Sequence, residues 1–134
     1  MITYLFDTNA VITFLNGKSS ALCNRVRNCK ATDFAMCSVV WAELYFGVAK
    51  SRDKHKTLEK VNSFAETFQN LDFDKDAAWH YGEIRAELEK NGSIIGPNDL
   101  MIASIARSKN LVLITNNIDE FKRVKGLKIE DWTV

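Results

Sequence analysis

The chain has 134 residues, of which 46% are hydrophobic and 26% are charged, and its formal net charge at pH 7 is +1. This length fits one compact domain over residues 1–134, and the near-neutral charge excludes a general attraction to nucleic acid, so such binding would require a local basic patch. No stretch approaches the roughly 18 apolar residues of a membrane-spanning helix, and no basic segment leads into an apolar one at the N-terminus, so we expect a cytoplasmic protein without membrane contact.

The cysteines and histidines exclude several kinds of site. Cys23, Cys29 and Cys37 are odd in number and form no C-x-x-C pair, which argues against both a disulfide framework and a zinc site. His55 and His80 are the only histidines, and neither has a serine, cysteine or second histidine at an informative spacing. The sequence therefore predicts buried thiols and neither a histidine-based triad nor a zinc centre.

The first predicted element is an apolar, β-prone strand, Ile2–Phe6, which ends at Asp7. The helix-capping residue Thr8 and the helical spacing of apolar residues over 11–15 then predict a turn and a helix. Asp7 would lie at the carboxyl end of a buried strand, where open α/β sheets bind ligands. It can equally stop the strand or cap the helix, so this stretch alone leaves both interpretations open.

Residues 16–20 predict the end of the first helix and the cap of a second one, which carries Leu22, Val26 and Cys29. The letters GKSS within this segment resemble part of a phosphate-binding loop. That motif requires a glycine where Ile12 stands, and it follows a strand instead of a helix, so we exclude it.

The next predicted strand, 34–38, ends at a capping serine, Ser38, and is followed by a helix over 39–49. This helix is apolar around most of its circumference, which predicts that it is buried. It carries Glu43, and a carboxylate on a buried helix needs a partner. Glu43 would then lie near the same sheet edge as Asp7; the alternative is that it points to water.

Residues 50–56 form a polar, mostly basic connection, which is either a solvated loop or a contact for phosphates. Beyond it the apolar pattern predicts a helix over 58–68, a short strand over 71–73, and a helix over 77–88 that stops at Asn91-Gly92.

Pro97 opens the next helix, and Asp99 lies in its first turn, where interaction with the positive helix terminus is one sufficient explanation for an acid. A buried-type strand over 111–114 follows and ends at Thr115-Asn116-Asn117. The pattern finally predicts a short helix over 118–123 and an edge strand over 127–130.

Strands that alternate with helices predict an α/β fold with a mainly parallel sheet of about five strands and helices on both faces. Connections in such sheets bring the polar groups at the strand ends to one edge, and four side chains map there: Asp7, Glu43, Asp99 and Asn117. Three carboxylates and an amide form a set of hard oxygen donors that suits Mg²⁺ or Mn²⁺ and does not suit zinc.

The order and spacing of several motifs resemble those of PIN-domain ribonucleases of the VapC toxin type over almost the whole chain. The motifs are DTN at Asp7–Asn9, WAELYFG around Glu43, GPNDLMIA around Asp99, TNN at Thr115–Asn117, EF at Glu120–Phe121 and the terminal IEDW. The resemblance implies a PIN-like three-layer fold. It also implies an Mg²⁺-dependent endoribonuclease, with Mn²⁺ as a possible substitute, that serves as the toxin of a type II toxin–antitoxin system and inhibits translation.

The resemblance further implies that Asp7, Glu43 and Asp99 are the metal-binding and catalytic acids. Supporting polar groups would be Thr8, Asn9 and Thr115. Many PIN domains have a fourth acid where this chain has Asn117, which can offer a carbonyl oxygen but no charge. Glu120 is the candidate substitute for that charge.

The implied substrate is a structured RNA, a tRNA loop in particular. Its phosphates would meet basic side chains, since clustered cations bind phosphates even on a nearly neutral protein. The candidate RNA-binding residues are Lys50, Arg52, Lys54, Lys56 and Arg85. The family also implies a homodimer and a VapB-type antitoxin that blocks the site. Contact with DNA would be indirect and would be made only through this antitoxin.

Two other classes compete with this interpretation. A phosphotransfer module also places an aspartate after its first strand, but the haloacid-dehalogenase type expects a second aspartate where Asn9 stands, and the receiver type expects a lysine where Thr115 and Asn116 stand. A catalytically silent α/β interaction module would use the acids only as caps and surface groups. Cleavage of RNA that depends on Mg²⁺ distinguishes the nuclease from both.

Overall fold

The computed structural model describes residues 1–134 and contains a five-stranded sheet in the order β3-β2-β1-β4-β5, in which every neighbouring pair is parallel. The strands are β1 (Tyr4–Phe6), β2 (Phe34–Cys37), β3 (Gln69–Leu71), β4 (Val112–Ile114) and β5 (Lys128–Glu130). The predicted α/β class and the parallel sheet are confirmed. Because β1 is the central strand, the residue that follows it lies in the middle of one sheet edge.

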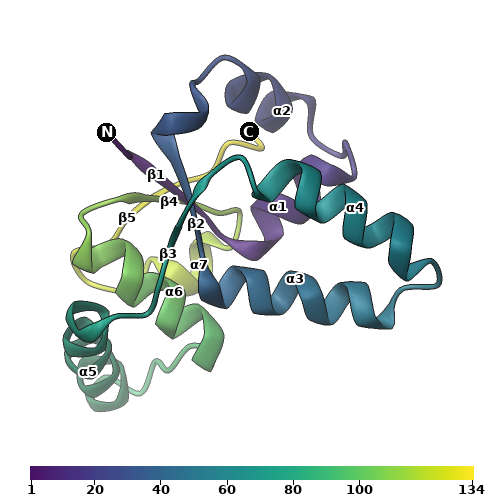
Figure 1. The fold of residues 1–134 in the computed structure, drawn as a ribbon. Helices are drawn as coiled ribbons and strands as arrows, with labels where there is room; N and C mark the ends of the chain where they lie inside the picture. The colour runs from purple at the N-terminus through teal and green to yellow at the C-terminus, as the bar shows by residue number, and fades with distance from the viewer.

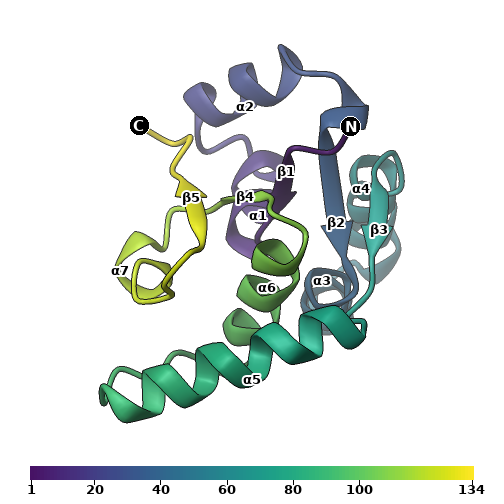
Figure 2. The same ribbon diagram turned by 90° about the vertical axis from the view of Figure 1, so that its left-hand side faces the viewer.

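Helices cover both faces of this sheet. In Figure 1, α5 and α6 lie to the left of the sheet and α1 and α4 to its right, and Figure 2 shows α5 and α6 from the front. The helices are α1 (Thr8–Leu15), α2 (Ser20–Arg27), α3 (Ser38–Lys50), α4 (Lys54–Ala65), α5 (Lys75–Lys90), α6 (Pro97–Ser108) and α7 (Ile118–Phe121). A short 3₁₀ helix, Ala31–Asp33, precedes β2. None of the helices is long and apolar enough to cross a membrane.

Aromatic rings form the core between the sheet and the helices α1 and α4. Phe6 on β1 stacks on Phe34 on β2 with ring centroids 4.7 Å apart, and Phe68 lies edge-on to both rings. Phe14 of α1 stacks on Phe64 of α4 at 4.5 Å. Aromatic pairs of this kind each contribute about 0.5–1.5 kcal/mol beyond their area burial, so they hold β1 and the last turn of α1 in fixed positions.

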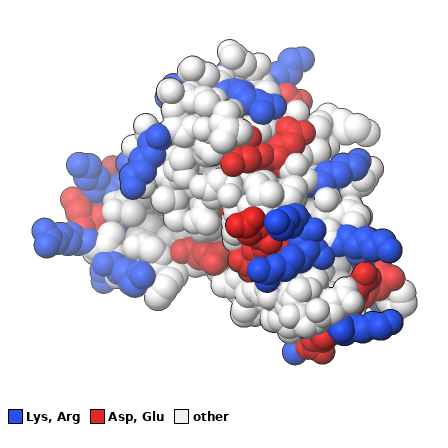
Figure 3. All heavy atoms as spheres, turned by 180° about the vertical axis from the view of Figure 1, so that it is seen from behind, with Lys and Arg blue, Asp and Glu red and all other residues white.

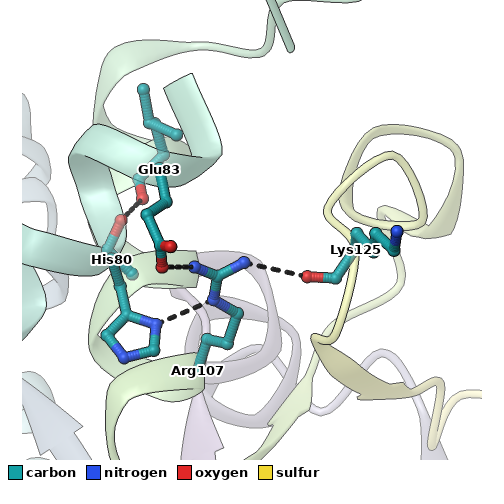
Figure 4. Close-up of polar contacts among 6 residues, drawn as sticks. His80, Glu83, Arg107 and Lys125 are labelled. Carbon is teal, nitrogen blue, oxygen red and sulfur yellow. Dashed lines mark hydrogen bonds and ion pairs between the residues drawn. The ribbon is translucent and has the colours of Figure 1, made fainter. Parts of the chain in front are cut away.

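On the other face, the side chain of Arg107 ties α6 to α5 and to the turn that follows α7 (Figure 4). Its Nε donates to His80 Nδ1 at 2.8 Å and its Nη2 to Glu83 Oε1 at 2.9 Å, both on α5. Its Nη1 donates to the carbonyl oxygen of Lys125 at 3.1 Å. The bond to Lys125 joins the segment that follows α7 to the helix that carries Asp99, and the other two bonds join that helix to α5.

Several element boundaries differ from the sequence prediction, and the structure explains two of the differences. The edge strand β3 is Gln69–Leu71 and not 71–73, because its register pairs Gln69 with Ala35 and Leu71 with Cys37. Phe73 instead packs edge-on against Tyr81 of α5. Helix α4 begins at Lys54, four residues earlier than its apolar pattern, because Asp53 caps it by accepting a hydrogen bond from the N–H of Lys56.

The prediction that the helix carrying Glu43 is buried nearly all round is wrong. Only Val40, Leu44 and Val48 of α3 are buried, whereas Tyr45 is 43% and Phe46 is 62% exposed. A helix on the outside of a sheet buries one stripe whatever the composition of its other side. Val39 and Trp41 are half-buried against the core, and Tyr45 and Phe46 form an exposed apolar surface on α3.

The predicted capping role of Ser38 is also wrong. Ser38 is the first residue of α3, and its N-cap position is held by Cys37 without a side-chain hydrogen bond. The hydroxyl of Ser38 donates instead to Asp72 Oδ1 at 2.7 Å, at the end of the neighbouring strand.

Candidate active site

Asp7 caps a helix, as one of the two interpretations of the sequence expected, and it lies at the sheet edge where the other interpretation expects a ligand. Its Oδ1 accepts a hydrogen bond from the N–H of Ala10 at 3.1 Å, which makes Asp7, and not Thr8, the N-cap of α1. Its Oδ2 accepts from Thr115 Oγ1 at 2.5 Å. Burial raises the pKa of Asp7, the bonds from Thr115 and the backbone oppose that shift, and repulsion from Glu43 adds to it.

Glu43 does not point freely to water, because residues from two other helices hold its carboxylate. The hydroxyl of Thr8, the first residue of α1, donates to Oε1 of Glu43. The side-chain amide of Asn98, in the first turn of α6, donates to Oε2 at 3.4 Å. The sequence analysis missed Asn98, although it lies next to Asp99 in the GPND segment.

Asp99 is half-buried in the first turn of α6, and its pKa is raised to about 7. Burial is the largest cause, followed by the hydrogen bond with Glu120 and by repulsion from Glu120, Asp7 and Glu43. The three acids that the sequence singled out therefore lie near enough for their charges to interact, and Glu120, the predicted substitute for a fourth acid, bonds to Asp99.

Glu120, in α7, is held in its charged form. Its Oε1 accepts from the N–H of Gly96 and its Oε2 from the side-chain amide of Asn117, both at 2.8 Å. Burial works against ionisation here, but these bonds and the one with Asp99 outweigh it and lower the pKa of Glu120. These bonds therefore favour the proton of the acid pair on Asp99 over Glu120.

Thr115 connects Asp7 with the residues that hold Glu120. It is 1% exposed at the end of β4, donates to Asp7, and accepts a hydrogen bond from the N–H of Asn117 at 3.0 Å. Asn117 in turn holds Glu120. The other supporting residue predicted from the sequence, Asn9, has an exposed side chain, and its backbone N–H supports the carboxylate of Asp7.

The donor set fits a hard divalent cation by its chemistry. Seven ion pairs occur in the protein, and none involves Asp7, Glu43, Asp99 or Glu120; of these four acids only Glu120 has a basic side chain, Arg123, near enough to lower its pKa. In the conformation described, no three histidine, cysteine, aspartate or glutamate side chains lie close enough together to hold a metal ion. Burial raises the pKa of the nearby Cys37 thiol to about 11, so this site has no thiolate ligand or nucleophile at neutral pH.

The predicted basic segment is not one loop. Lys50 is the last residue of α3, Arg52 lies in the connection, and Lys54 and Lys56 belong to the first turn of α4. Figure 3, seen from the side opposite to Figure 1, shows basic side chains gathered where α3 and α4 meet. Arg85 lies elsewhere, on α5, where it already donates to Glu89 Oε2 at 3.0 Å and to the Tyr81 hydroxyl at 3.1 Å.

Comparison with known proteins agrees with this arrangement. Residues 4–127 match the PIN domain family. The chain is 41% identical to ribonuclease VapC2 of Rickettsia felis over 130 residues, which cover 96% of this chain and 97% of that protein. It is 39% identical to the tRNA(fMet)-specific endonuclease VapC of Salmonella typhimurium over 132 residues, which cover 98% and 99% of the two chains.

Solved structures show the same relationship. The VapBC complex of Salmonella typhimurium bound to DNA contains a chain that superposes with a TM-score of 0.93 at 38% identity, over 98% of this chain and 99% of the other. The VapBC2 complex of Rickettsia felis, bound to a DNA fragment from its promoter, gives a TM-score of 0.88 at 40% identity and the same coverage. The chain belongs to the PIN domain family and, within it, to the VapC proteins.

Proposed function

We propose that this protein is an Mg²⁺-dependent endoribonuclease that acts as the toxin of a type II toxin–antitoxin system. The observation that carries the proposal is the convergence of Asp7, Glu43 and Asp99 at one sheet edge without a basic partner, where mutual repulsion contributes to the raised pKa values of Asp7 and Asp99. A site that gathers negative charge and leaves it without a basic partner is suited to a divalent cation.

The substrate that we propose is a tRNA, and the initiator tRNA in particular, because a relative that aligns over 98% of this chain is named for cleavage of tRNA(fMet). We further propose a homodimer in the cytoplasm and a VapB-type antitoxin, since the similar solved structures are VapBC complexes. Contact with DNA would then be indirect, through the antitoxin.

Each residue of the site has a role in this proposal. Asp7, Glu43 and Asp99 would hold Mg²⁺, which when bound polarises a phosphate and activates water. Thr115 fixes the orientation of the Asp7 carboxylate, and Thr8 and Asn98 fix that of Glu43. Glu120 supplies the charge that Asn117 lacks, while Asn117 positions it.

Asp99 must lose its proton before it can bind a cation. Its shared hydrogen bond with Glu120 would break in that step, and Glu120 would keep its partners Gly96 and Asn117. The acid pair therefore makes metal binding dependent on pH. The basic side chains at the junction of α3 and α4 would bind the phosphates that flank the cleaved one.

The test is cleavage of an initiator tRNA transcript and of total RNA by the purified protein with Mg²⁺ or with EDTA, followed by mapping of the new ends. We expect cleavage only with Mg²⁺, and a loss of at least roughly 100-fold in the Asp7→Asn variant with unchanged circular dichroism. Asp119→Asn is the matched control, because Asp119 is an exposed acid on α7 whose partner is Lys122. Cleavage by Asp7→Asn at the wild-type rate, or no cleavage of any RNA by the wild type, would refute the nuclease assignment.

A further inference from the structure

A cleft opens directly beside the acids. It is an open cleft of about 460 Å³ between α1, α3 and the start of α6. Its wall includes Thr8, Glu43 and Asn98, the three residues that hold one another at the candidate active site. A ligand in this cleft would therefore touch the side chains that position Glu43.

The outer part of the cleft is aromatic and basic. Phe46 of α3 is 62% exposed there, and Ile12 of α1 is 42% exposed opposite to it. The ammonium group of Lys50 lies over the Phe46 ring, 4.5 Å from its centroid. An exposed phenylalanine loses the benefit of burial, and one that lines a cleft next to a reactive site marks a ligand-binding surface.

Tyr45, the residue next to Phe46, shows that only one side of α3 presents an aromatic ring to the cleft. Tyr45 turns away from the cleft and donates its hydroxyl to Asn62 Oδ1 on α4 at 3.0 Å, and its ring packs on Trp41. Tyr45 therefore has polar and aromatic partners within the protein, whereas the Phe46 ring is stacked on no other aromatic ring and has the ammonium group of Lys50 over it.

We propose that Phe46 and Lys50 form a nucleotide subsite, in which one base of the substrate RNA stacks on Phe46 and the adjoining phosphate pairs with Lys50. The inference rests on the proposed function, since the cleaved phosphate must lie at the neighbouring carboxylates. The long side chain of Lys50 leaves the ring face when the base enters and moves its charge to the phosphate. The subsite orients the nucleotide next to the cleaved bond.

The chemistry of the cleft favours a nucleotide. An aromatic ring accepts any base by stacking, and a cation beside it accepts a phosphate, which is the combination that single-stranded nucleic acid sites use. The volume lies within the range of roughly 300–1,000 Å³ that is usual for pockets that hold small ligands. Five lysine and arginine residues against two acids within residues 50–60 extend the positive charge away from the cleft.

The test compares Phe46→Leu, Phe46→Trp and Tyr45→Leu in steady-state cleavage of the initiator tRNA transcript with Mg²⁺. Base–aromatic stacking predicts that Phe46→Leu raises KM by roughly 5- to 150-fold and changes kcat much less. Phe46→Trp should stay close to the wild type, because tryptophan also stacks. Tyr45→Leu, the matched control on the same helix, should not change KM, and equal effects of Phe46→Leu and Tyr45→Leu would overturn the subsite.

A second measurement identifies the group that Phe46 contacts. The substrate is a synthetic RNA that has an abasic nucleotide next to the mapped cleavage site, on the side that the subsite binds. On this RNA the KM of the wild type should rise by the same factor as the KM of Phe46→Leu rises on the intact RNA. Phe46→Leu should then lose nothing further on the abasic RNA. The stacking contact would be overturned if, at both nucleotides that flank the cleavage site, Phe46→Leu and the abasic substitution raised KM independently, so that their effects added.

The outcomes separate this inference from the proposed function. If the wild type cleaves RNA and Phe46→Leu cleaves equally well, the nuclease stands and the subsite is refuted. If Phe46→Leu keeps its KM for RNA but is inhibited less by a VapB-type antitoxin, the cleft is a protein-docking surface and the RNA subsite is again refuted. If the wild type cleaves no RNA, both proposals fail.

Discussion

Thr115 Oγ1 donates a hydrogen bond to Asp7 Oδ2 at 2.5 Å, and this bond joins the ends of two neighbouring strands that are 108 positions apart in the chain. Both residues are almost fully buried, at 1% and 3% exposure. The same hydroxyl accepts a hydrogen bond from the N–H of Asn117. One threonine thus orients the central acid of the site and the turn that carries its neighbours.

Replacement of Thr115 by valine should therefore reduce both activity and stability. The variant keeps the shape of the side chain but removes the donor to Asp7, and a hydrogen bond to a charged group contributes about 1.5–3 kcal/mol. We expect a lower free energy of unfolding by an amount in that range, measured by denaturant titration, together with slower RNA cleavage. Thr3→Val, at an exposed position, is the control and should change neither property. Full activity in Thr115→Val would show that Asp7 does not depend on this bond.

The pH dependence of stability provides a test of Asp99. Its pKa is about 7 in the folded protein and about 3.8 when unfolded, so between these values the folded state binds more protons than the unfolded state. The favourable contribution of the protonated form is complete below pH ~4 and is lost as pH rises through about 7. In EDTA, we expect the Tm of the wild type to fall relative to that of Asp99→Asn over this range. Parallel Tm curves for the two proteins would contradict the raised pKa.

Metal binding should reverse this effect. A cation that binds only the folded state raises its stability, so millimolar Mn²⁺ or Mg²⁺ should raise the Tm of the wild type at pH 8. Asp99→Asn removes one ligand and one repelling charge, so its Tm in EDTA should equal or exceed that of the wild type and should respond much less to metal. Asp119→Asn should respond as the wild type does. Equal metal responses in all three proteins would argue against a metal site at Asp99.

The basic residues at the junction of α3 and α4 should dominate the salt dependence of RNA binding. Joint replacement of Lys50, Arg52, Lys54 and Lys56 by alanine should weaken binding and reduce the slope of log K against log salt by about 0.7 for each lost contact with a single strand. A control variant that removes Lys18, Lys30, Lys75 and Lys128, which are also exposed, changes the net charge equally. The same slope in both variants would assign RNA binding to net charge alone. The predicted role of Arg85 is tested separately by Arg85→Gln.

Arg107 should be important for stability although it lies outside the site. Its side chain is 18% exposed, and its guanidinium donates to His80, Glu83 and the carbonyl of Lys125 (Figure 4). Arg107→Met keeps the apolar stem and removes all three bonds, so we expect a loss of about 1–3 kcal/mol in the free energy of unfolding. Arg123→Met, a more exposed arginine that donates to the carbonyl of Ile94, is the comparison and should cost less. An equal or smaller loss for Arg107→Met would mean that the network adds little.

The sequence by itself determined the α/β class, the parallel sheet and the identity of the acids at its edge. Helical and strand periods repeat in regular alternation, and acids such as Asp7 and Asp99 interrupt an apolar pattern, which is visible without coordinates. The whole-chain order of motifs around these acids was sufficient for the family. Local patterns carry this information because burial and capping act within a few residues.

Only the tertiary structure decided which groups hold these acids and which apolar residues remain exposed. The bonds from Thr115 to Asp7 and from Asn98 to Glu43 join residues 108 and 55 positions apart, and no local pattern specifies such partners. The exposure of Phe46 likewise depends on which side of α3 faces the sheet, since its residue type alone predicts burial. Packing between distant segments selects one face of each helix, and that selection placed an aromatic ring beside the acids.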